Sequence, residues 1–169
     1  MRLGVSSVLL LFGFCLVACN KPAVAVAQDA KQSAAALTGD RKGSAAANPQ
    51  CKLFTTAEVQ SYGGTAVSAG TNAALGSGCQ WPAAAGDGNG AAMLQILPAR
   101  DHEPPSGAPG FKRLAGVGKD GFVLPEMGGW HAGAIQGDRS INVTTSGPAA
   151  SEQKTVEFLR EAMRRVAGS

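Results

Sequence analysis

Aromatic side chains and histidines are scarce in this chain of 169 residues. Phenylalanine, tryptophan and tyrosine together make up 5% of it, and the two histidines are His102 and His131. Glycine, in contrast, occurs 23 times. Few bulky apolar groups and many conformationally free residues predict a small core and long loops.

The sequence also lacks the patterns that catalysis and metal binding require. His102 and His131 do not stand at metal-ligand spacing, and no serine lies in a Gly-x-Ser-x-Gly turn. Residues 116–121 match Gly-x-Gly-x-x-Gly, but a dinucleotide site needs a strand before this motif and a helix after it. Here a Pro- and Gly-rich stretch precedes the motif and a strand pattern follows it. We therefore expect no enzyme, no metal and no cofactor.

A concentrated basic surface is missing as well. The formal net charge is +3, and lysine and arginine are scattered except around Arg160, Arg164 and Arg165. Proteins that bind nucleic acid carry a basic patch or stripe. Nucleic acid is therefore excluded as an expected partner.

The longest apolar run lies at the start of the chain. Arg2 precedes residues 3–18, which are apolar or small. This order is typical of a secretory signal, and the run is shorter than the roughly 20 residues of a membrane span. The segment Leu16-Val17-Ala18-Cys19 resembles the lipobox of bacterial lipoprotein signal peptides. The resemblance implies a signal peptide of residues 1–18 and a lipid on Cys19. An ordinary secretory signal and an uncleaved anchor are the alternatives.

The expected location follows from the same resemblance. Asn20 stands where an aspartate typically retains lipoproteins at the inner membrane. This implies an outer-membrane protein, attached through its lipid and facing the periplasm. Within residues 19–49, Leu37 is the only large apolar residue, so this segment cannot repay the entropy cost of ordering. We predict a flexible linker there, followed by a globular domain over residues 50–169.

The cysteines predict one disulfide. Cys15 lies in the expected signal peptide and Cys19 carries the expected lipid, which leaves Cys51 and Cys79. Outside the inner membrane the compartment is oxidising, so these two are expected to be bonded. Two buried free thiols are the alternative.

Helices are predicted near both ends of the domain. Thr55 and Glu58 have the spacing of a capping box, and Gly63-Gly64 ends that helix after about two turns. The second helix begins after a cap at Ser151 or Ser146. Its apolar stripe consists of Val156, Leu159, Ala162, Met163 and Val166.

Strand patterns fill the sequence between the helices. Residues 79–97 read as a hairpin with a Gly-rich tip, residues 121–125 as a short strand and residues 126–129 as a turn. The clearest hairpin is 130–145, because Gly137-Asp138 suits a two-residue turn. Asp101-His102-Glu103, in a Pro- and Gly-rich loop, is expected to be a solvated surface turn.

The Gly137-Asp138 turn fixes which side chains share a face. Alternation along the strands places one group toward the core: Trp130, Ala132, Ala134, Ile141 and Val143. This face is the expected partner of the C-terminal helix. The opposite face carries Ser140 and the candidate binding surface, which consists of His131, Ile135, Asn142 and Thr144.

The order helix, strands, helix predicts an α+β fold with a largely antiparallel sheet and both helices packed on it. Three segments resemble the uncharacterised bacterial lipoproteins of the DUF3558 type, as does the glycine loop before the strand at 121–125. The three segments are Asn48-Pro49-Gln50-Cys51, then Leu53-Phe54-Thr55 with Ala57-Glu58-Val59, and Cys79-Gln80-Trp81. The resemblance implies a sandwich similar to Mog1/PsbP-like domains.

The function expected from these features is non-catalytic binding at the cell envelope. The domain would bind an envelope protein or a small envelope ligand while its lipid holds it at the membrane. The alternative is an inhibitor or immunity protein against a secreted hydrolase or toxin. That role needs a protruding loop, for which residues 98–110 or 125–131 could serve.

Overall fold

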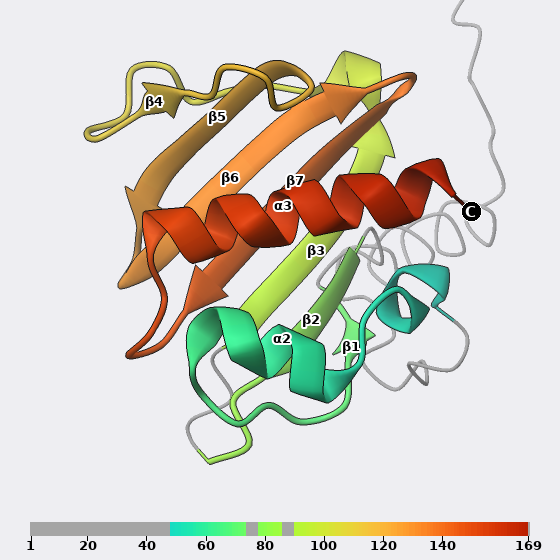
Figure 1. Cartoon of the computed structure of the whole chain (residues 1–169), viewed down its shortest axis with the longest axis vertical. Helices are drawn as coiled ribbons and strands as arrows, with labels where there is room; N and C mark the ends of the chain where they lie inside the picture. The colour runs from blue at the N-terminus through green and yellow to red at the C-terminus, as the bar shows by residue number, and fades with distance from the viewer. Residues whose placement is uncertain (1–47, 74–77, 86–89, 169) are drawn as a thin grey trace, which may run out of the picture.

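The computed structural model of the chain describes residues 48–73, 78–85 and 90–168. The predicted signal peptide, Cys19 and nearly all of the predicted linker lie outside the described residues. The described part is an open antiparallel sheet of seven strands, with two α-helices in front of it (Figure 1). The predicted α+β fold is therefore confirmed.

The N-terminal part of the domain is short and tightly capped. A 3₁₀ helix, η1 (Pro49–Lys52), leads into α2 (Thr56–Gly63). Thr55 and Glu58 form the predicted capping box, and Gly64 ends α2 in the left-handed conformation. The disulfide Cys51–Cys79 joins this part to the sheet with an S–S distance of 1.99 Å, which confirms the predicted pairing.

The sheet has the order β1-β2-β3-β7-β6-β5-β4. Its longer strands are β2 (Gly78–Pro82), β3 (Gly90–Pro98), β5 (Lys119–Glu126), β6 (Gly129–Gln136) and β7 (Arg139–Ser146). Each edge is a two-residue strand, β1 (Thr71–Asn72) or β4 (Lys112–Arg113). The sequence patterns did not predict these edge strands, because two residues are too few to show alternation.

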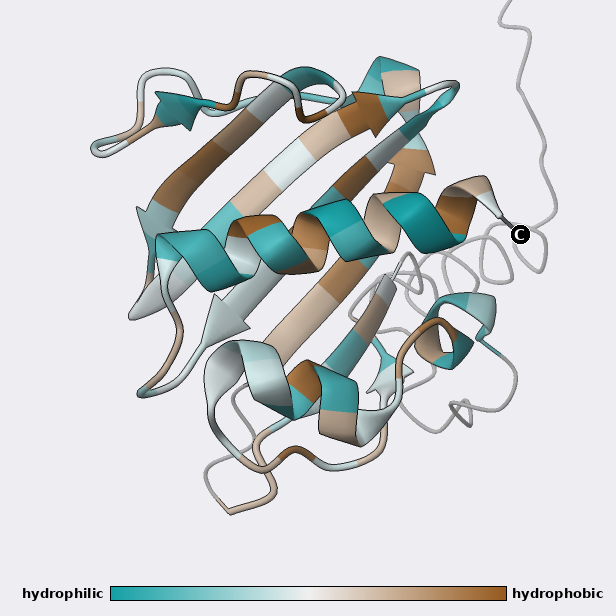
Figure 2. Cartoon of the chain, viewed as in Figure 1, coloured by the Kyte–Doolittle hydropathy of each residue, from teal (hydrophilic) through white to brown (hydrophobic). Residues whose placement is uncertain are grey.

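The β6–β7 hairpin has the predicted register. Ala134 pairs with Ile141 and Ala132 with Val143, and all four are fully buried. The helix α3 (Glu152–Ala167), capped by Ser151, packs on β5, β6 and β7. Figure 2 shows that the side of α3 turned away from the sheet is mostly hydrophilic.

Buried residues on α3 extend beyond the predicted stripe. Thr155 and Phe158 are fully buried along with Leu159 and Ala162, and Met163 is half-buried. Phe158 lies against Phe54 before α2 and stacks on Tyr62 within it, with ring centroids 4.9 and 4.7 Å away. The wider stripe follows from the position of α2 on the same side of the sheet as α3 (Figure 1).

Candidate functional site

The second face of the sheet is partly closed by the segment that follows β3. After the short 3₁₀ helix η3 (Ala99–Asp101), His102 and Phe111 lie against Phe122 of β5, with ring centroids 5.7 and 5.9 Å away. Phe122 is 1% exposed although it lies on this second face. Gly133 of β6 leaves the space that this ring fills, since a Cβ there would lie 2.8 Å from it.

A chain of hydrogen bonds fixes the covering segment to the sheet. Asn142 donates to the Ser140 hydroxyl over 3.0 Å, and this hydroxyl lies 2.8 Å from Nδ1 of His102. The other ring nitrogen of His102, Nε2, lies 3.2 Å from the Asp120 carbonyl oxygen. A carbonyl only accepts, so Nε2 donates to it, and in the neutral form of the ring Nδ1 accepts from the Ser140 hydroxyl. The prediction that residues 101–103 form a solvated turn is therefore wrong for His102, which is half-buried and bonded through both ring nitrogens.

His131 connects this face to the end of the β5–β6 hairpin. Its side chain is 22% exposed, and its Nδ1 lies 3.1 Å from Oε2 of Glu126, the last residue of β5. The Phe122 ring meets it edge-on at 5.1 Å. Burial lowers the pKa of His131 below its ordinary value, and the Glu126 carboxylate and hydrogen bonding only partly offset this effect. Near neutral pH the imidazole of His131 is therefore uncharged.

Met127, next to Glu126, is the most unusual residue at this end of the sheet. It forms the two-residue β5–β6 turn together with Gly128, and both have positive φ, 39° and 79°. A side chain in the left-handed region costs about 1–2 kcal/mol. Met127 is also 98% exposed, and among the described residues it is the one large hydrophobic side chain classed as exposed. The strained backbone thus holds an apolar side chain in solvent, where it adds nothing to the core.

A hollow of about 260 Å³ adjoins this turn. Its walls come from the facing ends of β3, β5, β6 and β7, and its lining residues are Met93, Glu126, Met127, Trp130, Thr144, Thr145 and Ser146. Trp130 is half-buried and packs against the main core on one side. We call Met127 together with this hollow the hairpin-tip site.

The candidate binding surface predicted from the sequence is divided by the structure. Thr144 lines the hairpin-tip site, and His131 contacts its carboxylate. Asn142 belongs instead to the hydrogen-bond chain, and Ile135 pairs with Lys119 and Ser140 nearer the other end of β6. The sequence pattern placed all four residues on the correct face of the sheet. It did not predict that Met93, Met127 and Trp130 line the hollow next to Thr144. A large apolar residue before Gly128-Gly129 in a turn was the signal that could have found Met127.

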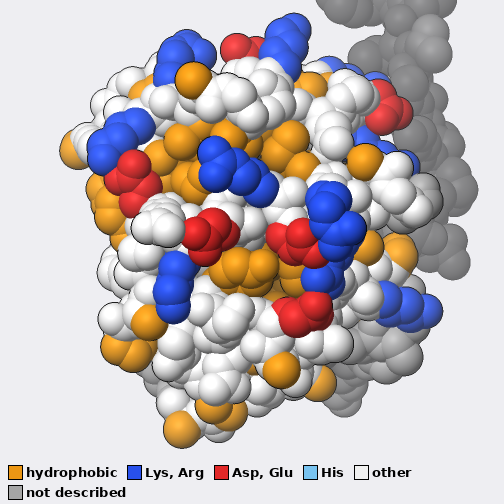
Figure 3. All heavy atoms as spheres, viewed as in Figure 1, with side chains coloured by type: hydrophobic (Ala, Val, Ile, Leu, Met, Phe, Trp, Pro, Cys, Tyr) orange, Lys and Arg blue, Asp and Glu red, His pale blue; other side chains and the backbone are white. Residues whose placement is uncertain are grey.

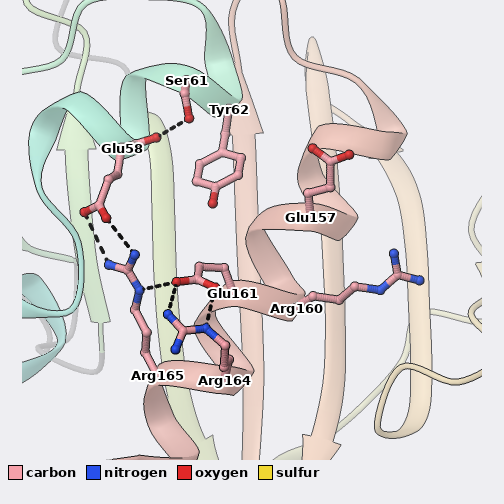
Figure 4. Close-up of a pocket in the computed structure, with 8 residues that line it drawn as sticks. All are labelled: Glu58, Ser61, Tyr62, Glu157, Arg160, Glu161, Arg164 and Arg165. Atoms are coloured by element: carbon pink, nitrogen blue, oxygen red, sulfur yellow. Dashed lines mark hydrogen bonds and ion pairs between the residues drawn. The ribbon is translucent and has the colours of Figure 1, made fainter.

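A larger hollow, of about 460 Å³, lies between α2 and α3 (Figure 4). Its lining residues are Glu58, Ser61, Tyr62, Glu157, Arg160, Glu161, Arg164 and Arg165. Arg165 bonds both Glu58 and Glu161, and Arg164 bonds Glu161, so most of these charges neutralise one another. Figure 3 likewise shows acidic and basic side chains mingled over the helices. This network joins the two helices, and we interpret it as structural.

The described part of the chain holds neither a metal-ligand cluster nor a membrane-spanning helix. No group of three or more histidine, cysteine, aspartate or glutamate side chains there could hold a metal ion. No helix within the same residues is long and apolar enough to cross a membrane. The chain matches no protein-family model and no curated protein.

Proposed function

We propose that this chain is a lipid-anchored protein of the cell envelope whose domain binds a partner protein through the hairpin-tip site. The lipobox-like segment ending at Cys19 supports the anchor, and Asn20 supports residence at the outer membrane, facing the periplasm. The resemblance to DUF3558-type lipoproteins and to Mog1/PsbP-like domains supports the same assignment.

The observation that carries the binding proposal is the conformation of Met127. An exposed apolar residue at a strained turn does not stabilise the folded state, and backbone strain of this kind is concentrated at functional sites. Methionine is flexible and polarizable, so it adapts to the surface of a partner. The adjoining hollow, lined by Met93 and Thr144 on the same face of the sheet, offers a place for a partner side chain.

Photo-crosslinking in intact cells tests this proposal. A benzophenone side chain is incorporated at position 127 or, as the matched control, at Pro109, which is also an exposed apolar residue in a loop. We expect one defined partner to crosslink from position 127 and not from position 109. With that partner purified, Met127→Ser should weaken binding at least about tenfold, the effect of losing about 1.4 kcal/mol. Equal crosslinking from both positions, or unchanged affinity, contradicts the proposal.

The anchor has its own test. Mass spectrometry of the mature N-terminal peptide should show a lipid on Cys19, and Cys19→Ser should release the domain from the membrane fraction. Wild-type protein should sediment with outer-membrane markers. Sedimentation with inner-membrane markers would contradict the location inferred from Asn20.

One observation favours the alternative function, an inhibitor or immunity protein. The predicted inhibitory segment 125–131 contains the β5–β6 turn, where an exposed apolar residue could insert into an enzyme cleft. If the partner crosslinked from position 127 is a hydrolase, its activity should fall when purified domain is added. Met127→Ser should relieve that inhibition, and full activity in the presence of excess wild-type domain would exclude this function.

A further inference from the structure

The sulfur of Met127 is more accessible to solvent than that of any other methionine in the domain. Beyond Met1, which lies in the predicted signal peptide, the methionines of the chain are Met93, Met127 and Met163. Met127 is 98% exposed, whereas Met93 and Met163 are half-buried. The methyl group of Met163 fills the space in which a Cβ on Gly118 would lie. An oxidant in solution therefore reaches Met127 before the other two, because the rate of oxidation follows exposure.

The cysteines of the domain do not compete for such an oxidant. Cys51 and Cys79 are joined in the disulfide, and Cys79 is fully buried. Oxidation of cysteine starts from a free thiolate, which neither residue presents. Among the described residues, Met127 is therefore the sulfur that reacts first with a peroxide.

The reaction of a thioether with hydrogen peroxide needs no further reactant. The sulfur takes one oxygen atom and gives up two electrons, the O–O bond breaks, and the rest of the peroxide leaves as water. The product, methionine sulfoxide, is polar, whereas the thioether is apolar. A partner surface that packs on the thioether would have to remove water from the sulfoxide oxygen, which is unfavourable without a new hydrogen bond.

The fold tolerates this change at position 127. The Met127 side chain lies in solvent and adds nothing to the core, so its sulfoxide stays hydrated. A sulfoxide at Met163 would instead lie against the main core, where an unpaired polar group is costly. Oxidation of Met127 is thus expected to change binding without unfolding the domain.

We infer that Met127 is an oxidation site, and that its conversion to the sulfoxide by a peroxide releases the partner from the hairpin-tip site. This inference rests on the proposed binding function and names how that function is regulated. The β5–β6 turn holds the reactive sulfur where both a partner and an oxidant in solution reach it.

The oxidation site can be measured on the purified mature protein. Hydrogen peroxide is added, and peptide mass spectrometry follows the sulfoxide at each methionine over time. We expect Met127 to react at least about tenfold faster than Met163, because it is far more exposed. Equal rates at the two residues overturn the inference.

The effect on binding is measured with the purified partner that crosslinks from position 127. Replacing Met93 and Met163 with leucine, a swap that cores tolerate, leaves Met127 as the only methionine of the mature protein. After peroxide treatment and removal of the peroxide, this variant should bind the partner at least about tenfold more weakly. Its urea unfolding midpoint should stay the same. Unchanged affinity, or a lowered midpoint that accounts for the loss of binding, overturns the inference.

Met127→Leu, with Met93 and Met163 intact, is the matched control. Leucine keeps an apolar side chain at the turn and has no sulfur to oxidise. Its affinity for the partner should therefore be the same before and after peroxide treatment. An equal loss of affinity in Met127→Leu would assign the effect to another residue and contradict the role of Met127.

Protection by the partner separates this inference from the proposed function. If the partner binds the hairpin-tip site, it covers Met127 and should slow sulfoxide formation there but not at Met163. Protection together with equal binding of the oxidised protein overturns the regulation and leaves the partner-binding function standing. A lack of protection, or of any partner crosslinked from position 127, overturns the proposed function and this inference with it.

Discussion

Arg165 of α3 binds the carboxylate of Glu58 in α2 through two nitrogens, with N–O distances of 2.6 and 3.3 Å. The same guanidinium donates to Glu161 and to the Leu53 carbonyl oxygen, and its carbon lies 4.2 Å from the centroid of the Phe54 ring. One side chain thus joins the last turn of α3 to the start of α2 (Figure 4). Since α2 is only eight residues long and would not be stable alone, this contact holds it in place.

Replacing Arg165 should therefore destabilise the domain. Arg165→Met should lower the free energy of unfolding by about 2 kcal/mol, because hydrogen bonds to charged groups contribute about 1.5–3 kcal/mol. Arg164→Met is the matched control: Arg164 is 70% exposed and, among the described residues, pairs with Glu161 alone, so its loss should lower stability much less than the loss of Arg165. Urea unfolding measures both. Equal effects of the two substitutions would contradict the role given to Arg165.

The same network predicts sensitivity to acid. The hydrogen bond from Arg165, together with hydrogen bonds from Thr55, lowers the pKa of Glu58 from 4.5 to about 2. Hydrogen bonds from Arg164 and Arg165 lower the pKa of Glu161 from 4.5 to about 2 as well. The unfolded chain then binds more protons than the folded one below pH 4.5, so stability should fall as the pH drops from about 4.5 toward 2. Glu58→Gln should flatten this fall, whereas Glu103→Gln should not. An unchanged acid profile in Glu58→Gln would refute the assignment.

A buried hydroxyl pair links α3 to the sheet. The hydroxyls of Thr145 in β7 and Thr155 in α3 are 2.5 Å apart, and Thr155 also donates to the Ser151 carbonyl oxygen at 2.9 Å. Thr145 is therefore the donor between the two. Thr155→Val leaves that donor buried without a partner and should cost about 1–3 kcal/mol. Thr145→Val should cost less, and the double valine variant should recover part of the loss. Additive losses would show that the pair is not coupled.

Much of the fold could be predicted because local rules act strongly in the elements concerned. Gly137-Asp138 sets the turn, and strict alternation then fixes every side chain of β6 and β7. The capping box at Thr55 and Glu58 depends on four consecutive residues, and the disulfide followed from counting cysteines. Each of these features is determined by neighbours in sequence or by a single pairing.

The rest depends on contacts between distant segments. Nothing in the pattern of residues 99–111 indicates that they return over the second face, and so His102 was mistaken for a solvated residue. The width of the buried stripe on α3 depends on where α2 lies, which made Phe158 hard to place. Gly133 in the middle of β6 was a usable signal, since a strand glycine often marks a close approach of another group. The exposure of Met127 depends on how far the β5–β6 turn extends beyond its neighbours.

The space above Gly133 can be tested directly. A Cβ at this position would lie 2.3 Å from Oδ1 of Asn142 and 2.8 Å from the Phe122 ring. Gly133→Ala should therefore force both groups to move and cost about 1–3 kcal/mol of stability, as overpacking usually does. Gly107→Ala is the control, because a Cβ there would meet nothing within 4 Å. Similar unfolding midpoints for the two variants would contradict the close packing of Phe122 on β6.

Protonation of His131 should weaken the fold at mildly acidic pH. Burial lowers the pKa of this imidazole; Glu126 and Asn142 raise it and His102 lowers it further, while the Phe122 ring packs edge-on against it. The unfolded chain takes up the proton near pH 6.5, while the folded chain resists it to lower pH. The contribution of the neutral ring is thus fully present above about pH 6.5 and declines as the pH falls below it.

Urea unfolding at pH 7.5 and at pH 5.5 measures this contribution, in a range well above the lowered pKa values of Glu58 and Glu161. Wild-type protein should be less stable at pH 5.5, and His131→Gln should show a smaller difference between the two conditions. If wild type and His131→Gln lose equal stability between the two conditions, His131 is not the group that titrates.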